Sequence, residues 1–116
     1  VPAGELAHCI RESLIYLTQY GAVCTLHQEG KGSVRSCDAQ NAYDFFEDCL
    51  EAALPSLSAL MVRVECGERF SIRLMMEDAA GLPNMDKYRT LGQLTIDDAD
   101  GALCATFTFD RGGECA

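Results

Sequence analysis

Two neighbouring segments that alternate between apolar and polar residues most restrict the folds open to this chain. Leu60–Cys66 and Phe70–Asp78 show this alternation, and Gly67 and Glu68 lie at the turn between them. A period of two is typical of strands with one buried face, and a short separator that contains glycine predicts an antiparallel hairpin. Another layer of structure must cover the apolar face of such a hairpin.

Two amphipathic helices are predicted to supply that layer. The clearer one follows Asp38, a good N-cap residue, and ends at Pro55. Its apolar residues form one continuous stripe, while the opposite face carries several carboxylates. An earlier helix is predicted over Glu5–Tyr20, and Gly21 ends it in the position that glycine commonly takes just past a helix.

The remaining segments complete an α+β pattern. Ala22–Gln28 is predicted as a strand, Pro83–Arg89 as a short helix, and Leu94–Asp97 with Leu103–Phe109 as a second hairpin. The resulting order is helix, strand, helix, hairpin, short helix, hairpin. This order predicts a two-layer sandwich, in which helices cover one face of a mixed, mostly antiparallel sheet.

The length of 116 residues predicts a single domain with one core. We expect an N-terminal helix within residues 1–20, a core sandwich over 22–110 and a frayed tail over 111–116. The chain starts at Val1 rather than at a methionine. We therefore expect it to be a fragment of a longer protein.

Charge and cysteine content restrict the partners and the compartment. The net charge of −9 disfavours nucleic acids and anionic membrane surfaces. No stretch approaches the ~20 apolar residues of a membrane helix, so we expect membrane contact only through other parts of the protein. The seven cysteines form no C-x-x-C pair, and their odd number argues against a closed disulfide framework. A reducing, cytoplasmic location is predicted.

The last third of the chain resembles a known family. Residues 81–85 (GLPNM), Arg89 and residues 91–96 (LGQLTI) are similar to the "G-L-x-x-M-x-x-R … L-G-G-x-L-x-I" stretch of bacterial sensor histidine kinases. The earlier helix and strands follow the order of the same family, so the resemblance covers roughly residues 20–110. The chain thus looks like the GHKL-type ATP-binding domain (also called HATPase) of these kinases.

The resemblance implies ATP and Mg²⁺ as ligands and assigns roles to five residues. Asp78 would bind the adenine, and Gly81 and Asn84 would lie against the nucleotide. Glu51 stands where the family has a magnesium-binding Asn, and Glu47 stands where it has a catalytic acidic residue. An alternative stays open for two of these residues. Asp78 also fits the solvated end of a strand, and Glu47 also fits the solvent-exposed face of a helix.

The chain departs from the family where the family binds phosphate. The two glycine positions after Asp78 hold Ala80 and Leu82. The segment between Asp78 and the short helix leaves no residues for the flexible glycine-rich lid of the family. Phosphate binding would then depend on the N-terminus of the short helix and on Lys87 or Arg89.

Three functions remain open at this stage. The domain is an active kinase domain, a degenerate relative that acts as a scaffold in signal transduction, or a small-molecule-binding or protein-interaction domain unrelated to kinases. The resemblance and its gaps together favour the degenerate relative. Expected partners are the dimerisation and phosphoacceptor domain of the same protein, a response regulator or a second copy. His8 is expected to be a helix surface residue and His27 a strand residue, because neither is followed by Asp or Glu as a phosphoacceptor is.

Overall fold

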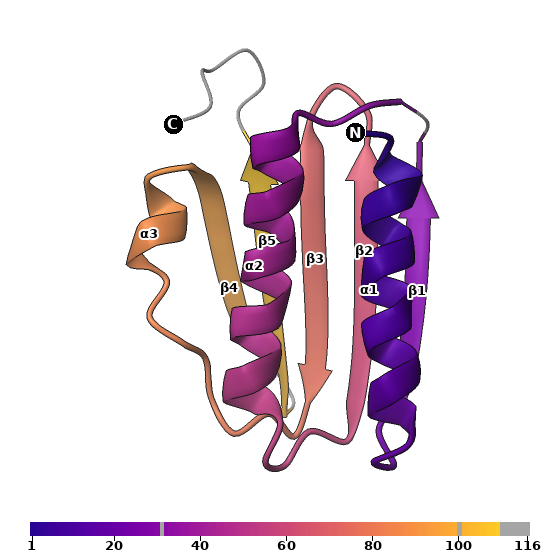
Figure 1. The fold of residues 1–116 in the computed structure, drawn as a ribbon. Helices are drawn as coiled ribbons and strands as arrows, with labels where there is room; N and C mark the ends of the chain where they lie inside the picture. Colours follow the sequence, from indigo (N-terminus) through magenta and orange to yellow (C-terminus); the bar gives the residue numbers. More distant parts are fainter. Residues whose placement is uncertain (31, 100, 110–116) are drawn as a thin grey trace.

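The computed structural model describes residues 1–30, 32–99 and 101–109 (Figure 1). Within these residues the secondary structure agrees closely with the sequence pattern. The elements are α1 (Ala3–Thr18), β1 (Val23–Glu29), α2 (Ser36–Ala53), β2 (Ala59–Cys66), β3 (Phe70–Glu77), α3 (Asp86–Arg89), β4 (Gly92–Ala99) and β5 (Ala102–Phe109). The predicted tail over 111–116 lies outside the described residues.

The strands form one mixed sheet in the order β1-β2-β3-β5-β4. β1 and β2 are parallel, and all other neighbours are antiparallel. Parallel strands require a crossover connection, and α2 supplies it between β1 and β2. The second hairpin then adds β5 beside β3 and leaves β4 at the edge of the sheet.

Both long helices lie on the same face of the sheet (Figure 1). α1 covers β1 and β2, while α2 covers β3 and β5. The strands alternate accordingly: Leu60, Val62 and Val64 of β2 are buried beneath the helices, whereas Met61 between them is 47% exposed. The predicted α+β two-layer sandwich is therefore confirmed.

Aromatic rings fill the core between α2 and the far half of the sheet. Phe45 from α2 lies 5.6 Å from Phe107 of β5, ring centre to ring centre. Phe109 lies 4.3 Å from Phe107 and 5.1 Å from Phe70. All four rings are at most 1% exposed. Burial of each such side chain stabilises the fold by roughly 1.5–3 kcal/mol, so this cluster fixes α2 against the sheet.

The helix α1 is an integral part of the sandwich. The N-terminal amino group of Val1 donates a 2.9 Å hydrogen bond to the carbonyl of Val34, and the amide of Ala3 donates to the carbonyl of Gly32 at 3.0 Å. Buried side chains such as Leu6, Ile10 and Leu14 of α1 belong to the same core as α2. No helix in the described part of the chain is long and apolar enough to cross a bilayer.

The predicted start of the second helix is wrong by three residues. α2 begins at Ser36, and Arg35 rather than Asp38 occupies the N-cap position. Asp38 lies in the first turn, is only 7% exposed and accepts a 2.9 Å hydrogen bond from Arg35 Nε. A buried carboxylate requires such a partner, and a negative charge near a helix N-terminus is favourable. The local sequence pattern alone does not distinguish a buried aspartate that pairs with Arg35 from an N-cap residue.

Replacing Gly30 with alanine should destabilise the domain more than replacing Gly21. Both glycines have positive φ, 84° and 92°, so each alanine costs roughly 1–2 kcal/mol of backbone strain. A Cβ on Gly30 would also lie 2.0 Å from the carbonyl oxygen of Cys66, whereas one on Gly21 would meet no atom within 4 Å. We expect Gly30→Ala to lower the free energy of unfolding in urea by about 2 kcal/mol more than Gly21→Ala. Equal losses would contradict the close approach of Gly30 to the end of β2.

Candidate functional site

Asp78 lies at the end of the sheet where α2 ends, β2 begins and β3 ends (Figure 1). β3 stops at Glu77, and Asp78 leaves the strand with a φ of 58°. Its carboxylate accepts a 2.6 Å hydrogen bond from Ser58 Oγ, and its carbonyl accepts another of 2.6 Å from Ser56 Oγ. Asp78 is exposed. The inward row of β3 therefore ends at Met76, and Asp78 lies at a solvated strand end, which is one of the two interpretations left open by the sequence.

The connection from Asp78 to α3 is short and anchored. Ala79 and Leu82 are half-buried and pack against the core. Gly81 does not need to be glycine for conformational reasons, because its φ is not positive and a Cβ on it would meet no atom within 4 Å. Asn84 uses its side-chain oxygen to accept a 2.9 Å hydrogen bond from the amide of Asp86, at the start of α3. Of the two predicted nucleotide contacts, Asn84 is thus already hydrogen-bonded within the chain, and the local backbone does not require glycine at position 81.

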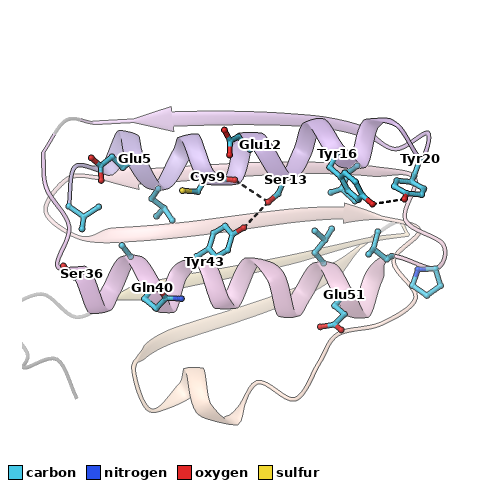
Figure 2. Close-up of a pocket in the computed structure, with 17 residues that line it drawn as sticks. Glu5, Cys9, Glu12, Ser13, Tyr16, Tyr20, Ser36, Gln40, Tyr43 and Glu51 are labelled. Carbon is cyan, nitrogen blue, oxygen red and sulfur yellow. Dashed lines mark hydrogen bonds between the residues drawn. The ribbon is translucent and has the colours of Figure 1, made fainter.

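The predicted acidic residues Glu47 and Glu51 lie on the outer surface of α2, and both are exposed. Glu51 is at the rim of a groove between α1 and α2 (Figure 2). Glu47 lies close to Tyr43: the hydrogen bond with Ser13 alone would lower the pKa of Tyr43, but burial and the Glu47 carboxylate raise it. In the described part of the chain, no hydrogen bond joins either glutamate to Asp78.

The described side chains do not form a metal site of their own. Within residues 1–30, 32–99 and 101–109, no group of three His, Cys, Asp or Glu side chains is arranged to hold a metal ion. Magnesium prefers an octahedral set of oxygen ligands, usually completed by substrate phosphates. Glu51, the predicted magnesium ligand, belongs to no such group. The described side chains therefore do not fit a magnesium site held by the protein alone.

The side of α2 that faces α3 carries a contact that the sequence did not reveal. Tyr88, from α3, is 1% exposed and packs edge-on against Phe45 and Phe107, with ring centres 5.3 and 5.8 Å away. Its hydroxyl donates a 2.5 Å hydrogen bond to Oδ2 of Asp48 on α2. Lys87 Nζ lies 3.1 Å from the same oxygen. The ring and these two polar contacts close the gap between α2 and α3.

The Tyr88–Asp48 contact changes the titration of both groups. The hydrogen bond from Tyr88, and then Lys87, hold the pKa of Asp48 below its ordinary value, although partial burial opposes them. Burial and the Asp48 carboxylate raise the pKa of Tyr88. Asp48 is therefore ionised and Tyr88 protonated at neutral pH, which is the state that the hydrogen bond requires.

Lys87 and Arg89, the two basic residues considered for phosphate binding, have different surroundings. Lys87 is committed to Asp48 and lies 4.9 Å from the centre of the Tyr88 ring. Arg89 is exposed at the end of α3. A buried aromatic residue in a short amphipathic helix was readable from the sequence, but its partner Asp48 is 40 residues away along the chain. Only the fold brings these residues together.

The histidines and cysteines outside this region show no convergent arrangement. His8 pairs with Glu12 at 3.2 Å and His27 with Glu29 at 3.1 Å, and all four side chains are at least half exposed. The expected positions of His8 on a helix surface and of His27 in a strand are therefore confirmed. Among the described residues, Cys9, Cys24, Cys49, Cys66 and Cys104 form no disulfide bond. Burial raises the pKa of Cys49 to about 12, so this thiol is unreactive.

Comparisons of sequence identify no relative: no protein-family model matches the chain, and no curated protein matches it. Comparisons of structure do. The catalytic domain of the histidine kinase ThkA superposes with a TM-score of 0.64 over 94% of this chain and 93% of that domain, at 7% identity. A second crystal form of the same domain gives a TM-score of 0.65, with 94% and 95% of the two chains covered, at 8% identity.

The histidine kinase domain of the blue-light-activated histidine kinase of Erythrobacter litoralis gives a TM-score of 0.63 at 14% identity. It matches 94% of this chain and 65% of that one. The chain therefore has the fold of histidine kinase catalytic domains, as its resemblance to the HATPase type implied. At such identities the likeness establishes the fold, and the chemistry must be argued from the residues themselves.

The variant Tyr88→Phe should lower the free energy of unfolding by about 1–2 kcal/mol at pH 7, because it removes a hydrogen bond to a charged group that is partly exposed. The pKa of Asp48 is depressed in the folded chain. Its contribution is therefore complete above the unfolded value near 4 and is lost as the pH falls through the folded value. Urea unfolding at several pH values should show wild type and variant converging in acid.

Tyr43→Phe is the matched control for that measurement. It removes a hydroxyl on α2, the helix that carries Asp48, and the partner of that hydroxyl is the neutral Ser13, 3.1 Å away. We expect a loss of about 0.5–1.5 kcal/mol, as for a hydrogen bond between neutral groups, with little change between neutral and acid pH. A Tyr88→Phe effect that did not depend on pH would show that the bond to ionised Asp48 is not what stabilises α3.

Proposed function

We propose that the chain is a degenerate ATP-binding domain of a sensor histidine kinase, which keeps the fold for signal transduction but has lost most of its affinity for nucleotide. The observation that carries this proposal is the filled gap between α2 and α3. In the family that the sequence resembles, the nucleotide lies between the helix corresponding to α2 and the segment that leads to the short helix. Here the buried ring of Tyr88 occupies that side of α2.

The connection after β3 supports the same proposal. Ala79 and Ala80 alone separate Asp78 from Gly81, and Ala79 and Leu82 are held against the core. A lid that folds over phosphates needs a free segment with several available backbone N–H groups. This short, anchored connection offers no such segment. The side chain of Asn84, at the end of this connection, already accepts a hydrogen bond from the amide of Asp86 at the start of α3.

The charges around α2 also oppose a bound triphosphate. The face of α2 that lies away from the core carries the four carboxylates Asp44, Glu47, Asp48 and Glu51. Lys87, which lies beside this face, is paired with Asp48. Like charges at short range disfavour binding unless metal ions or basic residues offset them. Weak or lost ATP and Mg²⁺ binding is the expected consequence.

Within a signalling protein, such a domain would act through contacts with other proteins. The dimerisation and phosphoacceptor domain of the same protein, a response regulator and a second copy are the partners we propose. A kinase that still binds ATP weakly through Asp78 is the competing interpretation, because the Asp78 carboxylate is exposed and close to the end of β3. An α+β binding domain that uses the surface between α1 and α2 is a second candidate function, favoured by the groove there.

Millimolar Mg-ATP should leave the melting temperature of the domain unchanged. A ligand present at a hundred times its Kd stabilises the native state by about 2.7 kcal/mol, which a thermal melt detects easily. The control is Asp78→Asn, which preserves the shape of the side chain and removes the carboxylate that the family uses for adenine. A saturable, magnesium-dependent rise in the melting temperature that Asp78→Asn abolishes would contradict the proposal and establish a working nucleotide site.

A further inference from the structure

A groove of about 1270 Å³ runs between α1 and α2 on the outer surface of the helical layer (Figure 2). Its apolar lining includes the buried Leu6 and Leu17 from α1 and the half-buried Leu50 from α2. Leu54, at the C-terminal end of α2, is 44% exposed and extends this lining to the surface. Small-molecule pockets usually enclose roughly 300–1,000 Å³, so the groove is larger and more open than such a site requires.

Tyrosines shape the groove along its length. Tyr43 of α2 reaches across to α1, where its hydroxyl lies 3.1 Å from Ser13 Oγ (Figure 2). Tyr16 and Tyr20 stand side by side at one end, with ring centres 5.4 Å apart and hydroxyls 3.0 Å apart. They are 60% and 71% exposed. Exposed tyrosines of this kind are frequent at protein interfaces, because a rigid ring gives a large contact area at little entropic cost.

The charged side chains that line the groove are all acidic. Glu5 and Glu12 come from α1 and Glu51 comes from α2, so carboxylates flank the apolar lining on both helices. The described residues that line the groove include no lysine and no arginine. Glu12 pairs with the exposed His8 at 3.2 Å. The surface therefore combines an apolar strip with a negative rim.

We propose that this groove is a docking site for an amphipathic, basic helix of another protein. Such a helix would place an apolar stripe on the leucine-lined strip and lysine or arginine side chains against Glu5, Glu12 and Glu51. The dimensions agree, because the 18 residues of α2 extend over about 27 Å and the groove is lined from Ser36 to Leu54. A helix of about four to five turns would fill this length.

Charge distinguishes this occupant from a second copy of the chain. Each copy carries a net charge of −9, so two acidic rims facing each other would repel. A basic helix is attracted by the same field, which also accelerates its association. The groove lies on the side of α2 away from α3 (Figure 1). This inference therefore does not depend on whether nucleotide binds near Asp78.

The test uses two fluorescent peptides of about 18 residues with leucines at the i, i+3, i+4 and i+7 positions of a helix. One peptide carries lysines beside the leucines, and the other carries glutamates there. Anisotropy titrations should show binding of the basic peptide, weakened by salt, and at least about tenfold weaker binding of the acidic peptide. Equal affinities for the two peptides, or no binding of the basic one, would overturn the proposal.

Two pairs of variants locate the site. Combined Glu5→Lys, Glu12→Lys and Glu51→Lys should weaken the basic peptide at least about tenfold, whereas Glu68→Lys, Asp97→Lys and Asp98→Lys change the net charge equally and should alter Kd by less than about twofold. Leu54→Ser should also weaken binding, while Met61→Ser, equally exposed on the opposite face of the sheet, should not. Circular dichroism verifies that each variant is folded.

Two further results also support or overturn the proposed docking site. Equal losses in the two charge variants would show that the peptide responds only to net charge, and the groove would not be its site. Sedimentation equilibrium of the unliganded chain tests the alternative occupant. A dimer that Leu54→Ser dissociates and Met61→Ser does not would assign the groove to a second copy and overturn the proposal. If the unliganded chain and both variants are monomers, no second copy occupies the groove, and this result supports the proposal.

Discussion

The burial of Tyr88 between α2 and the sheet is the contact on which the functional account depends. The ring fills the space beside Phe45 and Phe107, and the hydroxyl reaches the carboxylate of Asp48. A buried phenol without a hydrogen-bond partner would be costly, so Asp48 makes the burial possible. This one side chain anchors α3, which is only four residues long. It also fills the side of α2 that faces α3.

The two sides of α2 therefore differ in their packing. The side facing α3 is closed by aromatic packing and by an ion pair with Lys87. The side facing α1 is open, apolar at its base and acidic at its rim. Closed and well-packed surfaces contribute to stability, whereas open apolar surfaces are typical of sites where other molecules bind. The open groove of the described chain therefore lies on the side of α2 opposite to the packed contact with α3.

Most of the fold was predictable because each strand and helix has a clear period. The alternation around Gly67 and the stripe of α2 specified the hairpin, the covering helix and the two-layer sandwich. The site was not predictable to the same extent. Asp38 matched the local pattern of an N-cap, yet it is buried against Arg35, and Asp78 leaves the strand pattern through a positive φ. The Tyr88–Asp48 contact joins segments 40 residues apart, which no local pattern encodes.

The central claim is that Tyr88 stays bonded to Asp48 and excludes nucleotide. The most direct measurement is the proton NMR signal of the Tyr88 hydroxyl, which exchanges slowly with water when buried and hydrogen-bonded. It is assigned by its loss in Tyr88→Phe. We expect this signal to keep its position and intensity as Mg-ATP is added to millimolar concentration. A saturable shift or disappearance of the signal on titration would show instead that nucleotide enters between α2 and α3.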